Sequence, residues 1–232
     1  MQELKIIEDI NNYERFIVDS IKAISGKYTP YQVFSDWVTM SAMAISNACN
    51  MIHDSTYEER EERYRTIASK YSIEELKMFG NMTGALSLVL EGKFADVLGE
   101  IYMKSGCGNS NTGQFFTPYH LSYLAAKLCY SNQFEHYTEN GVIEINEPSV
   151  GAGGMMIAIA QIAKENGIDY QKKLHIVAQD LDYNGVYMTY IQLSLLGIKA
   201  IVVQGDTLRE NYRRGYDERR VYRTPAEMGA LL

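Results

Sequence analysis

The residues in this sequence that are best placed to bind a ligand are three carboxylates, each of which follows a predicted strand. They are Glu147 after residues 142–146, Asp180 after residues 174–179, and Asp206 after residues 200–204. Short apolar runs of this length are typical of buried strands, and the stretches between them have helical spacing. The carboxyl ends of parallel strands share one rim of a sheet, where such sheets bind ligands. The sequence therefore predicts that the three carboxylates lie together on one rim.

A glycine-rich turn separates the first predicted strand from the helix expected at Met155. Glu147 and Pro148 are followed by Ser-Val-Gly-Ala-Gly-Gly, so that Gly151 and Gly153 lie in the turn. Glycines let a ligand approach the backbone closely, and a helix start offers unpaired N–H groups. The G-x-G-G spacing differs from the dinucleotide fingerprint G-x-G-x-x-G, and here the acid precedes the glycines. This order suits a ligand with an amino group and a ribose; a turn that needs glycine only for packing is the alternative.

Each carboxylate matches a different part of one ligand. Asp180 stands near the offset at which an acid binds ribose hydroxyls in nucleotide folds. Glu147, beside the turn, is suited to an ammonium group, and Asp206 is suited to the exocyclic amine of adenine. Ammonium, ribose and adenine together describe S-adenosylmethionine, which we predict as the cofactor. Asp182 is better explained as the cap of the following helix.

Several segments then resemble one known family. Residues 111–118 read Asn-Thr-Gly-Gln-Phe-Phe-Thr-Pro and resemble the G-[EQ]-[FY]-[FY]-T-P signature of N6-adenine DNA methyltransferases, in particular the modification subunits of type I restriction systems. Residues 147–153 resemble that family's D-P-x-x-G-[ST]-G cofactor loop, with Glu in place of the usual Asp. Gln179-Asp180 resembles its ribose-binding acid, and residues 205–208 resemble its G-D-T-L motif. Together with the lead-in at 95–102, these matches occur in family order.

The resemblance implies an α/β fold in three parts. We expect a helical N-terminal domain over residues 1–105, then a partial Rossmann-like domain of the class I S-adenosylmethionine-dependent methyltransferases, with three αβα layers, over 106–208. An Arg/Tyr-rich tail occupies 209–232. The cofactor site implied by the resemblance consists of Phe116, Thr117, Pro118, Glu147, Pro148, Gly151, Gly153, Asp180 and Asp206.

One family motif, N-P-P-[FY], does not occur after Leu208. Of the four prolines only Pro225 lies there, and Ala-Glu follows it. In the family this motif holds the adenine amine and stacks an aromatic ring on the flipped base. Asn211-Tyr212 preserves two of the residue types but lies too near Asp206 to cross the sheet and return. We therefore expect no methyl transfer by this chain alone, no catalytic residues in it, and a partner that supplies the motif.

Three functions remain open at this point. The first is a DNA adenine-N6 methyltransferase of the type I modification class that is completed by another chain. The second is a family member that binds the cofactor but transfers nothing, as a regulatory or accessory subunit. The third is a non-catalytic interaction module that mimics a modification subunit. Affinity for S-adenosylmethionine separates the third function from the other two.

Composition bears on the partners and the compartment. The 232 residues carry a net charge of −7, which argues against gripping DNA alone; we expect DNA contact through a complex with a specificity or second modification subunit. The arginines and tyrosines of residues 209–223 suit either nucleic-acid contact or, as we favour, a disordered or partner-bound tail. Three separated cysteines predict neither disulfides nor a metal site. With no membrane span or signal peptide expected, the chain is predicted to be cytoplasmic.

The first 92 residues have helical periodicity without strands. We expect a helix that contains Tyr13 to Ile24, another after Thr29-Pro30, and one between Ile73 and Leu90 that is broken at Gly80 and Gly84. Residues 57–65 form a charged run that suits a solvated helix face, with Glu59 paired to Arg63. Right-handed crossovers order the three strands 3-2-1 and leave the first strand as a bare edge. Because exposed edges tend to be covered, we expect a homo-oligomer or a heterocomplex.

Overall fold

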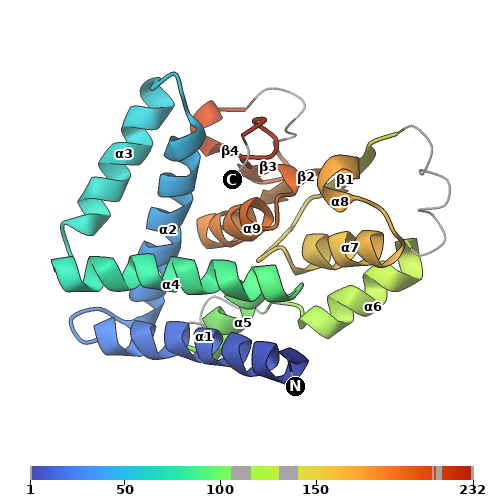
Figure 1. Ribbon diagram of the computed structural model, residues 1–232. Helices are drawn as coiled ribbons and strands as arrows, with labels where there is room; N and C mark the ends of the chain where they lie inside the picture. The colour runs from blue at the N-terminus through green and yellow to red at the C-terminus, as the bar shows by residue number, and fades with distance from the viewer. Residues whose placement is uncertain (1, 106–115, 131–140, 211, 213–215, 231–232) are drawn as a thin grey trace.

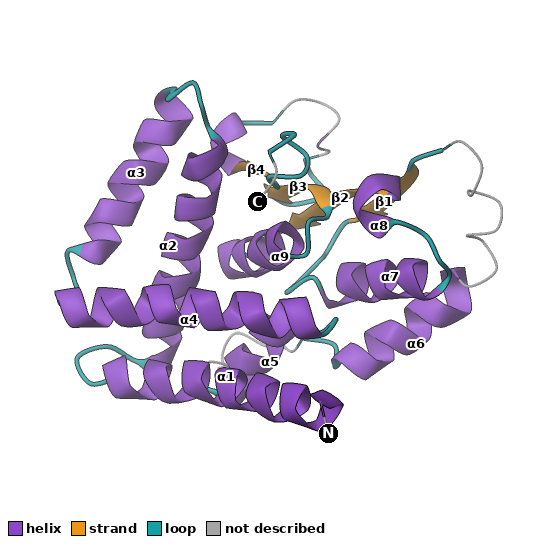
Figure 2. Ribbon diagram, viewed as in Figure 1, coloured by secondary structure: helices purple, strands orange, loops and turns teal. Residues whose placement is uncertain are grey.

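Residues 2–105, 116–130, 141–210, 212 and 216–230 are described by the computed structural model, which combines a group of helices with a small sheet (Figures 1 and 2). The helices are α1 (Gln2–Ile24), α2 (Pro30–Cys49), α3 (Ser55–Ala68), α4 (Ile73–Gly92), α5 (Val97–Lys104), α6 (Tyr119–Tyr130), α7 (Gly154–Glu165), α8 (Tyr170–Lys173) and α9 (Tyr183–Leu195). The strands are β1 (Ile143–Glu147), β2 (Leu174–Asp180), β3 (Lys199–Gln204) and β4 (Val221–Arg223). The fold is therefore α/β, as predicted.

Local sequence signals set the starts of the N-terminal helices. The Thr29 side chain accepts a hydrogen bond from the Gln32 backbone N–H, and Pro30 occupies the first turn of α2. At the start of α4, Ser72 and Glu75 form a reciprocal capping box. These side chains satisfy backbone groups that a helix start otherwise leaves without partners.

α4 is continuous, so the predicted break at Gly80 and Gly84 is wrong. Neither glycine has a neighbouring atom within 4 Å of the position that a Cβ would take, so both face open space. A glycine inside a helix costs about 1 kcal/mol relative to alanine. The opposite face of α4 buries Phe79, Met82 and Leu86, and this packing outweighs the cost of two glycines.

The sheet has the order β1-β2-β3-β4, in which the first three strands are parallel. The predicted 3-2-1 order of these strands is confirmed, and no strand of the described residues pairs with the outer edge of β1. β4 pairs antiparallel with β3, with Val202 opposite Tyr222. On the β3 side the sheet therefore ends in a short antiparallel strand, while on the β1 side the described residues leave the backbone edge of β1 unpaired.

The two faces of the sheet are covered differently. Alternate residues such as Ile176, Ala178 and Val202 are fully buried beneath the helical layer that contains α7 and α9. On the second face, where a third layer was expected, the packing described is made by tyrosine side chains of the C-terminal segment. Tyr212 and Tyr216 pack there on the apolar side chains of β3 and β4, and Glu144 of β1 is exposed. The sheet is thus fully buried on one face only.

Part of the C-terminal tail is folded, contrary to the disordered or partner-bound tail that was favoured. A short 3-10 helix, η3 (Glu218–Arg220), leads into β4, and the Tyr222 side chain is only 2% exposed. Its ring packs edge-on against Tyr187 of α9, with the ring centroids 5.4 Å apart. Burial of one large aromatic side chain stabilises by a few kcal/mol, which offsets much of the entropy cost of ordering a strand of three residues.

The charged run 57–65 lies on α3, yet it is not simply a solvated face. Arg60 is only 9% exposed: its Nη1 donates to Ser46 Oγ at 2.7 Å and its Nη2 donates to the Val221 carbonyl at 2.7 Å. The predicted pair of Glu59 with Arg63 is replaced by a contact of the Arg63 guanidinium with the rings of Tyr183 and Tyr187. α3 therefore holds the folded part of the tail against the core.

We predict that Arg60→Gln lowers the free energy of unfolding by about 2 kcal/mol, because the substitution leaves the Val221 carbonyl and the Ser46 hydroxyl without their charged donor. Urea titration measures this change. The matched control is Arg65→Gln on the same helix, where an exposed pair with Glu61 is lost and the expected change is below about 0.5 kcal/mol. Equal effects of the two substitutions would show that Arg60 does not anchor β4.

Candidate functional site

The glycine turn between β1 and α7 folds against the end of β2. The Val150 N–H donates to the Gln179 carbonyl at 2.9 Å, which fixes the turn above the sheet. Gly151 and Gly153 have φ angles of +57° and +96°, in the left-handed region that only glycine adopts without strain. Gly153 is the N-cap residue of α7 and provides no side-chain cap. The first N–H groups of α7 therefore face the turn.

Asp180 is the anchor of this turn. Its Oδ2 accepts a hydrogen bond from the Gly151 N–H at 2.7 Å, and its Oδ1 accepts one from the Asp182 N–H at 2.9 Å. The Asp180 carbonyl also accepts from the Gly205 N–H at 2.8 Å, which ties the ends of β2 and β3 together. A carboxylate has about four acceptor positions, so Asp180 can still bind hydroxyl groups of a ligand.

Two polar side chains of α9 hold the other side of the turn. Thr189 Oγ1 donates to the Gly151 carbonyl at 2.9 Å, and Gln192 Nε2 donates to the Ala152 carbonyl at 2.8 Å. Both side chains are fully buried. Because buried polar groups are costly without partners, these bonds hold the turn in one conformation. Asp182 caps α9 through a bond from the Gly185 N–H at 3.4 Å, as expected.

The other two predicted acids lie on the same rim. Glu147 is the last residue of β1, and its Oε1 accepts from the Ser149 N–H at 3.2 Å. Asp206 follows β3, accepts from the Leu208 N–H at 3.0 Å and lies 3.4 Å from Arg209 Nε. Thr207 Oγ1 donates to the Pro148 carbonyl at 2.7 Å, which links the segment after β3 to the glycine turn. The three carboxylates therefore share one rim.

A cavity of about 220 Å³ lies beside the glycine turn. Four of the predicted residues line it, namely Phe116, Thr117, Glu147 and Gly151. The Phe116 ring lies against Gly151 and packs edge-on against Tyr102, with the centroids 5.3 Å apart. Pro118, Pro148, Gly153, Asp180 and Asp206 lie outside this lining. Gly113, Gln114 and Phe115 of the same sequence motif lie outside the described residues.

Asp96 also lines the cavity, and the sequence analysis did not single it out. It caps α5, where its Oδ1 accepts from the Gly99 N–H at 2.9 Å and from Gln192 Nε2 at 3.0 Å. The side chain is only 4% exposed, and burial raises the pKa of its carboxyl above the usual value, against the lowering effect of these hydrogen bonds. The available signal was an aspartate three residues before Gly99, which is the spacing of a helix cap.

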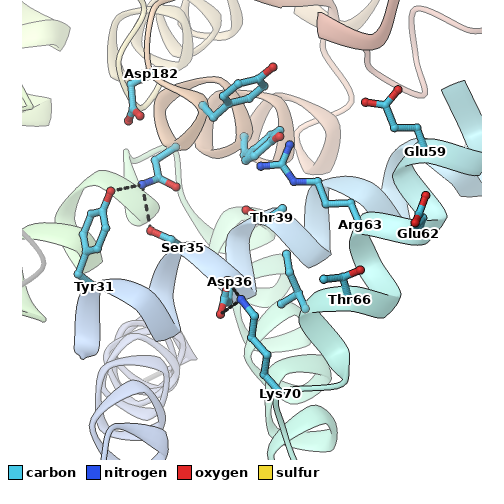
Figure 3. A pocket seen from close by; sticks show the side chains of 14 residues that line it. Tyr31, Ser35, Asp36, Thr39, Glu59, Glu62, Arg63, Thr66, Lys70 and Asp182 are labelled. Carbon is cyan, nitrogen blue, oxygen red and sulfur yellow. Dashed lines mark hydrogen bonds and ion pairs between the residues drawn. The ribbon is translucent and has the colours of Figure 1, made fainter. Parts of the chain in front are cut away.

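A second, larger cavity of about 660 Å³ lies between α2, α3 and the start of α9 (Figure 3). Some of its polar groups bind one another: Lys70 Nζ lies 3.2 Å from Asp36 Oδ2, and Asn184 Nδ2 donates to Tyr31 Oη at 3.1 Å. The Arg63 guanidinium lies over the ring of Tyr183, 5.2 Å from its centroid. The two basic side chains of this lining, Lys70 and Arg63, are therefore already engaged by other side chains of the protein.

Two kinds of feature are absent from the described residues. No helix in those ranges is both long and apolar enough to cross a membrane. Within the same part of the chain, no group of three or more His, Cys, Asp or Glu side chains has an arrangement that could hold a metal ion.

Comparison with known families identifies the chain. The sequence profile of the N-6 DNA methylase family matches residues 94–221, which is more than half of the 232 residues and includes the glycine turn. The chain belongs to this family. The match covers Asp96 as well as the three rim carboxylates and extends into β4. No curated protein sequence matches the chain.

Solved structures also resemble this family member. A Listeria monocytogenes protein described as a class I S-adenosylmethionine-dependent methyltransferase matches at 12% identity, with a TM-score of 0.47 and coverage of 87% of this chain and 54% of that one. The type I restriction-modification methyltransferase subunit of Streptococcus thermophilus matches at 12% identity, with a TM-score of 0.42 and coverage of 90% and 60%. A DrdV–DNA complex matches at 14% identity, with a TM-score of 0.42 and coverage of 89% and 26%. The chain thus spans little more than half of the first two.

We predict that the stability difference between the parent chain and Asp96→Asn depends on pH. The raised pKa of folded Asp96 means that the folded state binds more protons than the unfolded state between the unfolded pKa and the higher folded pKa. The parent chain therefore loses stability relative to the variant as the pH rises through this window. The negative charge of Glu100 raises the pKa of Asp96 in the same direction as burial does.

Urea titrations of both proteins at several pH values from about 4 to 8 measure this difference. Subtracting the two curves removes the contributions of all other carboxyl groups, among them Asp217 and Glu218, whose pKa values are lowered by the neighbouring arginines. A difference that is constant over the range, or that favours the parent chain at high pH, would contradict the assignment.

Proposed function

We propose that this chain binds S-adenosylmethionine at the glycine turn, as the cofactor-binding part of a DNA adenine-N6 methyltransferase of the type I modification class. The observation that carries the proposal is the cavity at the turn, where Phe116 and Thr117 meet Glu147 and Gly151 within the region matched by the N-6 DNA methylase family. Residues distant in the sequence are brought together there by α6, β1 and α7.

The residues present fit the chemistry of this cofactor. Glu147 ends β1 beside the cavity, and a carboxylate there is suited to an ammonium group. Asp180 retains acceptor capacity for ribose hydroxyls, and Asp206 lies on the rim where an adenine amine can be bound. Phe116, Thr117 and Pro118 would contact the methionine part. Pro148, Gly151 and Gly153 would shape the backbone that the ligand approaches.

The size of the cavity indicates which part of the ligand would lie inside it. A volume of about 220 Å³ is below the range of about 300–1,000 Å³ that is usual for pockets of small-molecule ligands. The amino-acid part of the cofactor would enter this cavity, and the adenosine part would extend over the rim along Asp180 and Asp206. When bound, the cofactor supplies an electrophilic methyl group.

DNA and partner chains are part of the same proposal. The net charge of −7 disfavours independent binding to duplex DNA, so DNA would be contacted in a complex with a specificity subunit or a second modification subunit. A homo-oligomer or a heterocomplex could also cover the outer edge of β1. Two alternative functions are a regulatory or accessory subunit that binds the cofactor but transfers no methyl group, and an interaction module that mimics a modification subunit without using a cofactor.

We predict that the purified chain binds S-adenosylmethionine or its demethylated product and that Asp180→Ala weakens the binding by about 1.5–3 kcal/mol, the scale of a lost charged hydrogen bond. Isothermal titration calorimetry measures both. Asp180→Asn keeps one acceptor for the Gly151 N–H, so its affinity is expected to lie between those of the parent chain and Asp180→Ala. Asp169→Asn, an exposed acid paired with Lys172 and remote from the turn, is the control and should bind as the parent does. Absence of any binding by the parent would favour the interaction module.

We also predict that these 232 residues alone transfer no methyl group to DNA, even when the cofactor is bound. Transfer requires the amine to be held in line with the methyl group and the flipped base to be stacked, and the sequence contains no N-P-P-[FY] motif for this role. Incubation of adenine-rich duplex with tritium-labelled cofactor measures transfer. Addition of a second chain that carries the motif is the positive control and is expected to give labelled DNA. Label incorporated by this chain alone would overturn the prediction.

A further inference from the structure

Asp96 has one carboxylate oxygen that the fold does not use. Its Oδ1 accepts both hydrogen bonds that the side chain makes, whereas Oδ2 has no hydrogen-bond partner among the described residues. A Cβ placed on Gly154 would lie 3.3 Å from Oδ2 and 3.5 Å from Ser122 Oγ. Gly154 and Ser122 both line the cavity at the glycine turn, so Oδ2 lies on the side of that cavity.

The charged side chains in the described lining of the cavity are all negative. Its described lining contains two carboxylates, Asp96 and Glu147, and no Lys, Arg or His side chain. Asp96 is only 4% exposed, so water screens its charge poorly and burial without a counter-charge is costly. A ligand that carries a positive charge would remove this cost. An anionic ligand group at the same place would be repelled by both carboxylates.

The structural role of Asp96 does not require its second oxygen. A helix cap needs one acceptor, and asparagine caps as well as aspartate does. Gln192 Nε2 likewise donates to Oδ1 alone. An amide at position 96 would therefore maintain the start of α5 and its link to α9. The free carboxylate oxygen and its charge are left for a ligand.

We propose that Asp96 is a further binding residue of this site and that, together with Glu147, it binds the ammonium group of the ligand's amino-acid part. The inference rests on the proposed binding of S-adenosylmethionine and extends it to a residue from outside the strand ends and the glycine turn. Because Asp96 is the N-cap residue of α5, the N-terminal helical region would contribute directly to ligand binding.

The test compares two neutral thioethers that share the same adenosine part. S-adenosylhomocysteine carries the ammonium-bearing amino acid, and 5′-methylthioadenosine lacks it. Calorimetric titration of both ligands into the parent chain and Asp96→Asn is expected to show at least a tenfold loss of affinity for S-adenosylhomocysteine. Affinity for 5′-methylthioadenosine should change by less than about twofold, since a tenfold change needs an interaction of about 1.4 kcal/mol that this ligand does not make.

Asp54→Asn is the matched control. Asp54 caps α3 through the Thr56 and Tyr57 N–H groups, so the substitution has the same chemistry in an exposed cap outside the cavity. It should bind both ligands as the parent does. Asp96→Ser, which also keeps a capping oxygen, replaces Asp96→Asn if thermal unfolding shows that the amide disturbs the fold.

The outcomes separate the two levels of the proposal. Equal weakening of both ligands by Asp96→Asn would show that Asp96 only shapes the turn, and unchanged affinity for both would show that it does not contact the ligand. Either result overturns the inference and leaves cofactor binding intact. If the parent chain binds neither ligand, the proposed function fails and this inference fails with it.

Discussion

The fully buried side-chain amide of Gln192 is the contact on which the arrangement of the site depends. Its Oε1 accepts from the Leu98 N–H at 3.1 Å, while its Nε2 donates to Asp96 Oδ1 and to the Ala152 carbonyl. One side chain of α9 thereby joins the start of α5 to the glycine turn. Because each of these groups would be costly to bury without a partner, the relative positions of α5, α9 and the turn are fixed together.

The order of the elements and the rim of carboxylates could be predicted from the sequence because they follow from local patterns. Short apolar runs located β1 to β3, the spacing after Asp182 located α9, and Gly197, with a φ of +67°, ends that helix as expected. Cofactor binding, DNA contact and partner chains stay predictions, since a family profile establishes membership and not the activity of an individual chain.

The features that were not predicted depend on contacts between distant segments. Helical propensity disfavours Gly80 and Gly84, but tertiary packing of the opposite face decides the continuity of α4. The residues of β4 alternate poorly, and the strand forms because Tyr222 is buried against α9 and Arg60 of α3 binds the Val221 carbonyl. Asp96 resembles an ordinary cap in sequence, and only the fold shows that it shares a cavity with Glu147.

Because β4 closes one side of the sheet, a further strand would be added beside β1. One side ends at β4, whose Val221 carbonyl is bound by Arg60, while β1 keeps an unpaired backbone edge among the described residues. A strand added in register with the first three would run parallel to β1 and end on the rim beside Glu147. The carboxyl end of an incoming polypeptide strand would thus be delivered next to the glycine turn. A chain that docked through such a strand would bring its own residues to the glycine turn as it bound.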